Sequence, residues 1–227
     1  MKEWCIPEAS AAFVAHMENV LDVYEQPYNP LEPVVCFDES TRQLIDDVRT
    51  LLPTQPGQVA RQVAEYQRNG TANLFMCFEP LRGWRHVTLT EHHTRQDFAH
   101  QIRLLVDTVY PHATCIHLVL DNLNTHALAS LYETFSPAEA NRLSKRLAFH
   151  FTPRHGSWLN MTEVEFSVLS RLALDQRIPT LSALQRIIGC WEATRNTKGA
   201  SVNWRFTAQA RPSQARPSLS LNSCLTG

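Results

Sequence analysis

The sequence has few glycines, no long apolar run and no closely paired cysteines, and each absence excludes a class of protein. Seven glycines in 227 residues argue against a phosphate-binding site built from glycine-rich loops. No apolar run approaches the ~20 residues that a membrane-spanning helix needs, and the N-terminus lacks the apolar core of a secretory signal. None of the six cysteines forms a C-x-x-C pair, and the ten histidines lack zinc-ligand spacing. We therefore expect free thiols in a reducing cytosol and no membrane partner.

The net charge of −1 gives no overall sign of nucleic-acid binding, but the charges are unevenly distributed. Residues 1–60 contain ten acidic and three basic side chains, whereas residues 176–227 contain seven basic side chains and one acidic side chain. Between Glu139 and Glu163 there are four basic residues and no acidic one. This distribution predicts either a basic surface beside an acidic site or ordinary solvated faces.

Strand-like and helix-like segments alternate along the chain. A capped amphipathic helix with Ser10 as its N-cap is expected at 7–24, followed by a proline-rich linker. Strands are expected at 34–38, 72–79, 85–90, 115–121 and 148–152. Further helices are expected between Thr94 and Pro111 and at 127–135, 139–147, 159–174 and 180–193, and an irregular segment at 50–70. This order predicts an α/β layered domain with a mixed sheet and helices packed on it.

Three carboxylates stand where strands or a helix would present them to one site. Asp38 ends the apolar run 33–37, and Asp121 ends the run 115–120. Each could by itself be a turn residue, but together they fit the ends of core strands, where α/β sheets place their sites. With a helical glutamate they would form an all-oxygen site, which suits Mg²⁺ or Mn²⁺. Two ions held in this way drive in-line attack on a phosphodiester.

The helical pattern does not decide which glutamate completes this site. On the helix expected at 159–174, Glu163 falls outside the apolar arc and Glu165 falls inside it. A glutamate inside an apolar arc must lie near an edge, be paired, or bind a metal. Both residues therefore remain candidates at this point.

Five sequence blocks resemble those of a known family; they are Val34–Glu39, Gly70–Phe75, Gly83–Val87, Leu118–His126 and His155–Glu163. On these blocks the chain resembles bacterial insertion-sequence transposases of the Tc/mariner group, which carry a DDE-type endonuclease domain. The resemblance extends from about Trp4 to Thr207. It implies a ribonuclease H-like α/β fold, in which helices flank a mixed five-stranded sheet.

The resemblance also implies a reaction and its site. The acidic triad of the family falls on Asp38, Asp121 and Glu163, so Glu163 is preferred over Glu165. These carboxylates would hold two Mg²⁺ (or Mn²⁺) ions for DNA strand cleavage and transfer, with no covalent protein–DNA intermediate.

Several residues near the triad are candidates for contacts with DNA. Arg154, His155 and Ser157 are candidate contacts of the scissile phosphate, with ordinary loop positions as the alternative. Asn122 and His126 are candidates for orienting metal ligands or DNA, with a surface position at a helix N-terminus as the alternative for His126. Trp158 is expected to pack against the protein rather than stack on a base.

The implied partners are double-stranded DNA, as element ends and target, and a second copy of the chain in a synaptic complex. The first 32 residues are too short for the helix-turn-helix reader of the family, so we expect that end recognition either comes from a separately encoded helix-turn-helix subunit or has been lost. The expected location is the bacterial cytoplasm, in association with the nucleoid.

Four regions are expected: an N-terminal helix and linker at 1–32, the catalytic domain at 33–175, a helical extension at 176–208 and a disordered tail at 209–227. The tail repeats Ala-Arg-Pro-Ser and no longer resembles the family, as a frameshift would produce. Two alternatives are a truncated remnant that binds DNA or a partner without transposing, and another ribonuclease H-like nuclease.

Overall fold

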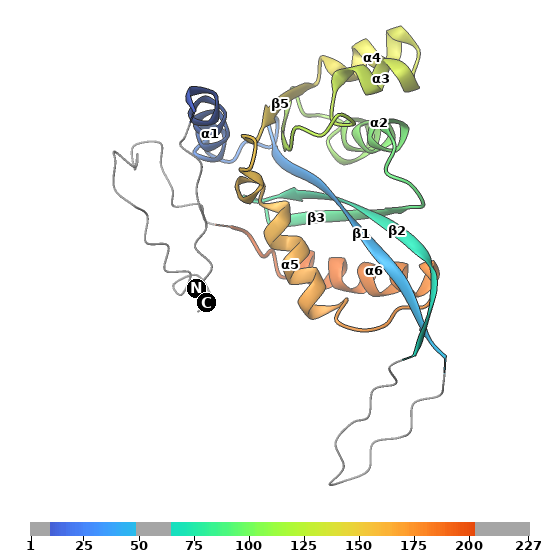
Figure 1. The fold of residues 1–227 in the computed structure, drawn as a ribbon. Coiled ribbons are helices and arrows are strands. Elements are labelled where there is room, and N and C mark those ends of the chain that lie inside the picture. The colour runs from blue at the N-terminus through green and yellow to red at the C-terminus, as the bar shows by residue number, and fades with distance from the viewer. Residues whose placement is uncertain (1–9, 49–64, 203–227) are drawn as a thin grey trace.

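Five strands form one mixed sheet in the order β3-β2-β1-β4-β5 (Figure 1). The structure is a computed structural model that describes residues 10–48 and 65–202. The strands are β1 (Val34–Asp47), β2 (Tyr66–Glu79), β3 (Trp84–Thr90), β4 (Ile116–Leu120) and β5 (Leu147–Phe151). β2 pairs antiparallel with both β1 and β3, whereas β4 pairs parallel with both β1 and β5. The predicted mixed five-stranded sheet is therefore confirmed.

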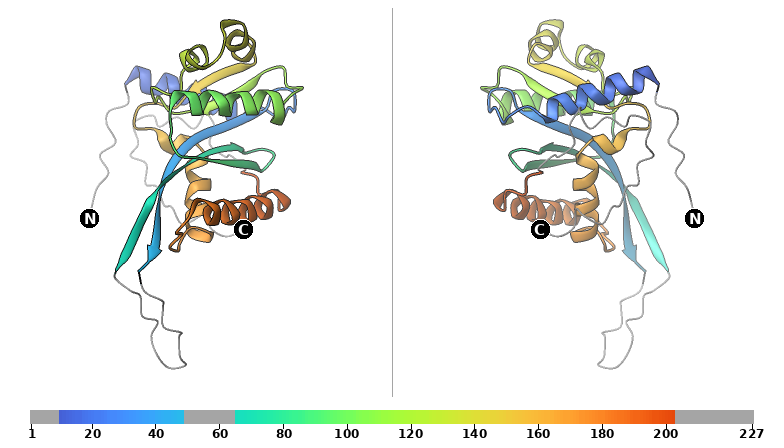
Figure 2. Two further views of the ribbon diagram at one scale, coloured as in Figure 1. Left: turned by 90° about the vertical axis from the view of Figure 1, so that its right-hand side faces the viewer. Right: turned by 90° about the vertical axis from the view of Figure 1, so that its left-hand side faces the viewer.

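Helices cover both faces of this sheet (Figures 1 and 2). One face carries α2 (Arg95–Leu104), its π-helical continuation (Leu105–Val109), α3 (Leu128–Thr134) and α4 (Pro137–Ser144). The other face carries α5 (Thr162–Leu172) and α6 (Leu181–Thr197), and α1 (Ala11–Tyr24) lies beside β5. None of the helices in the described ranges is long and apolar enough to cross a membrane.

Two predicted helix starts have the hydrogen bonds that their sequences indicated. Ser10 is the N-cap of α1, and its hydroxyl accepts a hydrogen bond from the backbone N–H of Phe13 at 3.1 Å. Thr94 and Asp97 form the predicted capping box of α2, in which each side chain binds the backbone N–H of the other residue. These bonds satisfy N–H groups that would otherwise lack a partner at the first turn.

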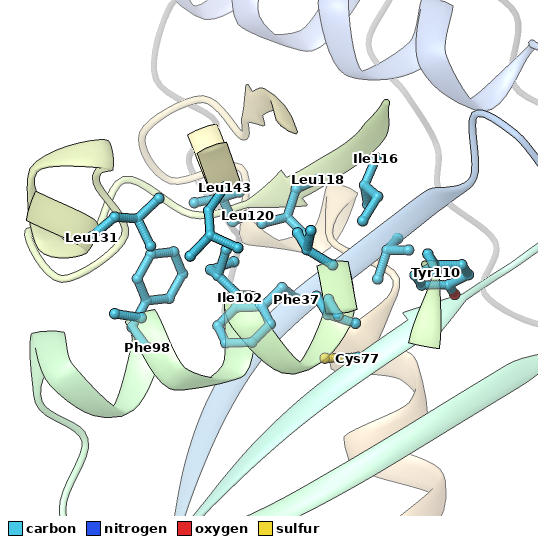
Figure 3. Close-up of a cluster of buried hydrophobic side chains, with 14 of the residues drawn as sticks. Phe37, Cys77, Phe98, Ile102, Tyr110, Ile116, Leu118, Leu120, Leu131 and Leu143 are labelled. Atoms are coloured by element: carbon cyan, nitrogen blue, oxygen red, sulfur yellow. The ribbon is translucent and has the colours of Figure 1, made fainter. Parts of the chain in front are cut away.

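The uninterrupted apolar run at the start of β1 is explained by burial on both faces. Val35 and Phe37 join the core beneath α2, where Phe98, Ile102 and Leu118 also lie (Figure 3). The alternate residues Val34 and Cys36 belong to a second cluster with α1 and the segment before α5. Because neighbouring side chains of a strand point to opposite faces, a central strand must be apolar throughout.

Strands β1 and β2 are longer than the sequence predicted. β1 continues nine residues beyond Asp38, to Asp47, and β2 begins at Tyr66 rather than at residue 72. The added segments are mostly polar, but Leu44 is buried against α5 and α6, and Thr41 hydrogen-bonds Asn73 across the pair at 2.8 Å. The paired strands extend past the helices as an arm (Figure 2). The prediction of an irregular segment is therefore wrong for 66–70, while 49–64 lie outside the described residues.

Helix α1 is fixed to the domain through its C-terminal half. Val20 and Tyr24 are buried, and the Tyr24 hydroxyl donates to the carbonyl of Leu159 at 2.8 Å. This contact places α1 against the segment that leads into α5. The expected tail at 209–227 lies outside the described residues, as do residues 1–9 and 203–208.

A histidine pair connects β4, β5 and α1 and predicts a loss of stability in acid. His150 Nδ1 donates to Asn19 Oδ1 at 2.8 Å, so its Nε2 must accept from His117 Nδ1 at 3.0 Å. Burial, and then the charge of His117, lowers the pKa of His150 from 6.5 to about 4. The unfolded chain therefore binds more protons at His150 than the folded chain does between these values, and stability should fall as pH falls.

We expect the contribution of this histidine to the free energy of unfolding to decrease by about 1–2 kcal/mol as pH falls from 6.5 towards 4, because water that reaches the half-buried ring screens part of the effect. The difference between the wild type and His150→Gln in urea unfolding at successive pH values measures this contribution, because Asp38, whose pKa is raised to about 7, adds stability as pH falls over the same range. In His150→Gln the decrease should be smaller, because position 150 no longer titrates. An equal pH dependence in the variant would contradict the assignment.

Candidate active site

The register of the sheet places Asp38 and Asp121 on neighbouring parallel strands. Cys36 of β1 pairs with Val119 of β4, and each aspartate lies two residues beyond this pair. Asp121 follows the last residue of β4, as expected, whereas Asp38 lies within β1 rather than at its end. Strand alternation puts Asp38 on the same face as Cys36, which is the face of α1 and the segment before α5.

Buried polar residues before α5 hold the Asp38 carboxylate. Asn160 is buried, and its Nδ2 donates to the Phe37 carbonyl at 2.8 Å and to Asp38 Oδ2 at 3.3 Å. Thr162, also buried, donates its hydroxyl to Asn160 Oδ1 at 2.7 Å. These bonds connect β1 to the start of α5 and set the position of one carboxylate relative to the helix.

The surroundings of Asp38 oppose the ionisation of its carboxyl group. Burial, and then the charges of Asp121, Glu39 and Glu163, raise the pKa of Asp38 to about 7, although the backbone N–H of Glu39 acts in the other direction. Within the described ranges no cationic side chain is paired with Asp38. A carboxylate in this situation favours a bound cation.

Asp121 is held by a buried histidine that bridges two carboxylates. His126 Nδ1 lies 2.6 Å from Asp121 Oδ1, and its Nε2 lies 2.8 Å from Glu39 Oε2. Burial disfavours the imidazolium, but the hydrogen bond to Asp121 and the close contact with the Glu39 carboxylate outweigh burial and raise the pKa of His126 to about 9. Burial likewise disfavours the Asp121 carboxylate, and the contact with His126 outweighs it and lowers the pKa of Asp121. His126 therefore orients Asp121 and stabilises its negative charge.

The two glutamates of α5 have different surroundings. Glu163 is exposed in the first turn of α5 and lines a groove together with Asp38. Glu165 is buried between two arginines. Its Oε2 lies 3.1 Å from Arg85 Nε, and its Oε1 lies 2.6 Å from Arg195 Nη2. The apolar-arc position of Glu165 is thus explained by pairing. Glu163 is the glutamate that is available to a ligand in the groove.

The three candidate carboxylates offer ligands of the type that a hard cation prefers. The donor set consists of carboxylate oxygens, which suits Mg²⁺ or Mn²⁺, and Asp38 has no cationic partner among the described residues. In the parts of the chain that the structure describes, no three Asp, Glu, His or Cys side chains are grouped closely enough to hold one ion as they stand. Coordination of a metal by the triad therefore stays a prediction.

A tight loop before α5 exposes the other candidate residues. His155 has a φ of 64°, which non-glycine residues rarely adopt, and a Cβ at Gly156 would come within 2.5 Å of Pro153. Arg154, His155 and Ser157 are all exposed. Trp158 is 58% exposed, so the expectation that it packs against the protein is wrong. Strained backbone that presents polar side chains to solvent is common at functional sites.

Two residues after β4 have structural partners. The side-chain amide of Asn122 donates to the Thr152 carbonyl at 2.7 Å and so connects the loops after β4 and β5. His126 is buried, so the alternative of a surface residue at a helix N-terminus is wrong, and its contact with Asp121 agrees with an orienting role.

The basic stretch after Glu139 is less available than its charge suggests. Arg142 forms ion pairs with Asp107 and Glu139, and Arg146 donates to the carbonyls of Tyr110 and Pro111. These contacts neutralise Arg142 and fix Arg146 on the protein. Arg154 is the exposed arginine of this stretch that forms no ion pair within the described residues.

Sequence reasoning did not single out Asn160, Thr162 or Glu39. Asn160 and Thr162 belong to the His155–Glu163 block. The available signal was that these two polar residues flank Met161. Glu39 follows Asp38 and therefore points to the opposite face, where His126 packs on Phe37 with ring centroids 5.5 Å apart. No sequence pattern indicated that this histidine would connect Glu39 to Asp121.

A comparison with protein families agrees with this arrangement. A family model described as DDE superfamily endonuclease matches residues 33–185, more than half of the chain. The chain belongs to the DDE superfamily endonucleases. The match includes Asp38, Asp121 and Glu163, whereas most of α6 in this DDE superfamily endonuclease lies beyond it. The comparison with curated proteins found no match.

Solved structures of the Mos1 transposase are similar to this DDE superfamily endonuclease. The Mos1 strand transfer complex has a TM-score of 0.59 at 14% identity, and the paired-end complex with the left transposon end has 0.55 at 16%. Each match covers 88% of this chain and 61% of the Mos1 chain. The Mos1 paired-end complex with Mn has a TM-score of 0.53 at 15% identity and covers 88% and 62% of the two chains. At these identities the likeness shows the fold, and it confirms the ribonuclease H-like prediction.

Proposed function

We propose that this chain is a transposase catalytic domain that cleaves DNA strands and joins them to a target with divalent metal ions. The observation that supports this most directly is the placement of the carboxylates. Asp38 and Asp121 stand on adjacent parallel strands, and Glu163 shares a groove with Asp38, in a chain that belongs to the DDE superfamily endonucleases.

The candidate metal ligands are Asp38, Asp121 and Glu163. When bound, Mg²⁺ or Mn²⁺ would supply positive charge at the attacking and leaving oxygens of the phosphodiester. Asn160 fixes Asp38 against β1, and His126 holds Asp121 through a short hydrogen bond. The protein groups therefore position the carboxylates before DNA arrives, which lowers the cost of organising the site.

The partners in this proposal are double-stranded DNA and a second copy of the chain. The similar Mos1 structures are a paired-end complex and a strand transfer complex, and we extend this mode of assembly to the present chain. Arg154 and Ser157, exposed beside the helix that carries Glu163, would contact the scissile phosphate. On the sequence resemblance we also propose that a helix-turn-helix subunit supplies end recognition, and that the protein acts in the bacterial cytoplasm.

Nicking of DNA by the purified full chain tests this function. A supercoiled plasmid that carries the element ends should be converted to nicked circles in Mg²⁺ or Mn²⁺ and should stay intact in EDTA. Cleavage that continues in EDTA would contradict the proposal. A further outcome is that the chain binds DNA without cleaving it, even when the separately encoded helix-turn-helix subunit is added. That result would identify the chain as a non-transposing remnant.

A further inference from the structure

A groove of about 540 Å³ extends from Asp38 and Glu163 along one side of α5. Its walls come from β1 and α5, and its lining residues are Asp38, Glu39, Ser40, Glu163, Phe166, Ser167, Ser170 and Arg171. On α5 these residues recur at intervals of three or four positions, so they occupy one helical face. The groove is therefore a continuous track beside the helix that carries Glu163.

The two ends of this track differ in charge. The carboxylates of Asp38 and Glu163 stand at one end, and Arg171 is the single cation among the lining residues. Glu163 and Arg171 are eight positions apart on α5, which corresponds to about 12 Å along the helix axis at ~1.5 Å per residue. Two serines, Ser167 and Ser170, lie between them, and both are exposed.

Arg171 forms no ion pair within the part of the chain that the structure describes. Its Nε donates to the carbonyl of Ser167 at 3.4 Å, and no carboxylate in residues 10–48 or 65–202 forms an ion pair with it. Some other exposed arginines are neutralised, as Arg95 is by Glu133 and Arg142 is by Asp107. The guanidinium of Arg171 is therefore available to an anion in the groove.

A chain of phosphates fits this arrangement better than an isolated anion. The acidic end would repel an anion unless a metal were present, whereas hydroxyls and a guanidinium bind phosphate oxygens. A ligand that satisfies both ends must carry one phosphate to the carboxylates and another to Arg171. A nucleic-acid strand has this repeat built into it.

We propose that one strand of the DNA runs along α5, with one of its phosphates bound by Arg171. This inference rests on the proposed function, because the other end of the track is the cleavage site. Since a strand of B-form DNA has one phosphate for each ~3.4 Å of axis, a distance of about 12 Å places the Arg171 phosphate three or four nucleotides from the cut.

Binding measurements on the full chain test this assignment. We expect Arg171→Ala to lower the affinity for a short random-sequence duplex, measured in Ca²⁺, about fivefold to tenfold. The slope of log affinity against log salt should fall by about 1, the value of one lost phosphate contact. Arg171→Lys should restore part of the affinity, because it keeps the charge. Arg186→Ala is the matched control, since Arg186 is exposed on α6 and does not line the groove.

A neutral methylphosphonate locates the contact. Once the cut is mapped, a methylphosphonate at the third or fourth phosphate from it should weaken binding by the wild-type chain and have little effect on Arg171→Ala. Equal affinities of Arg171→Ala and Arg186→Ala would overturn the inference, as would equal sensitivity of both chains to the methylphosphonate. If neither the wild type nor a variant cleaves DNA with any divalent metal ion, the proposed function fails. The comparison of Arg171→Ala with Arg186→Ala still decides whether Arg171 binds a phosphate.

Discussion

Replacing Glu163 by glutamine should lower metal-dependent DNA cleavage on the order of a thousandfold while changing the free energy of unfolding by less than about 0.5 kcal/mol. Glu163 is exposed and faces the groove, so its loss removes a candidate metal ligand and no packing contact. The cleavage effect follows because a metal supplies several kcal/mol of transition-state stabilisation, and each ~1.4 kcal/mol corresponds to a factor of ten. Single-turnover nicking rates and urea unfolding measure the two quantities.

Glu91→Gln is the matched control for this substitution. Glu91 is exposed and does not line the groove, so both its cleavage rate and its stability should stay at the wild-type values. If Glu163→Gln cleaves normally and a folded Glu165→Gln does not, the roles of the two glutamates are reversed.

Replacing Glu165 by glutamine should have the opposite profile, with a loss of about 3–5 kcal/mol in stability. The carboxylate bridges Arg85, whose side chain is fully buried, and Arg195 of α6. Arg85 also donates to the Ala200 carbonyl at 2.7 Å and stacks over the Phe78 ring. Removing the negative charge leaves a buried guanidinium uncompensated, and such a charge costs several kcal/mol.

A second variant in the network of Glu165, Arg85 and Arg195 separates the cost of an unpaired buried charge from the cost of lost packing. Arg195 is 22% exposed, so Arg195→Met should destabilise the chain less than Glu165→Gln does. Urea unfolding of both variants gives the comparison. A change below about 1 kcal/mol in Glu165→Gln would show that Arg85 finds another partner and that the network does not stabilise the fold.

The elements with a strong local pattern could be predicted from the sequence. The run before Asp38 has no polar residue, so it had to be a strand buried on both faces, and Thr94 and Asp97 could be recognised as a capping box. The extension of β1 to Asp47 could not be predicted, because its polar residues are stabilised by pairing with β2 and by contacts of Leu44 with distant helices.

The site was predictable in its carboxylates but not in the residues that support them. Asp38 and Asp121 could be found because each follows a buried run. The bridge from Glu39 through His126 to Asp121 depends on which face of β1 each residue occupies, and the bond from Asn160 to Asp38 joins residues 122 positions apart. Contacts of this kind arise from the tertiary arrangement, for which the local pattern carries no signal.

Binding of Mg²⁺ to the DNA-free chain tests the central claim most directly, because it needs neither the element ends nor a partner. Saturating Mg²⁺ should raise the melting temperature of the wild-type chain, since a ligand at a hundred times its Kd stabilises by about 2.7 kcal/mol. Asp38→Asn should not respond to Mg²⁺, and without metal it should be more stable than the wild type, because burial opposes the Asp38 charge. An equal increase in the melting temperature of wild type and Asp38→Asn would show that Mg²⁺ binds elsewhere and would contradict the account.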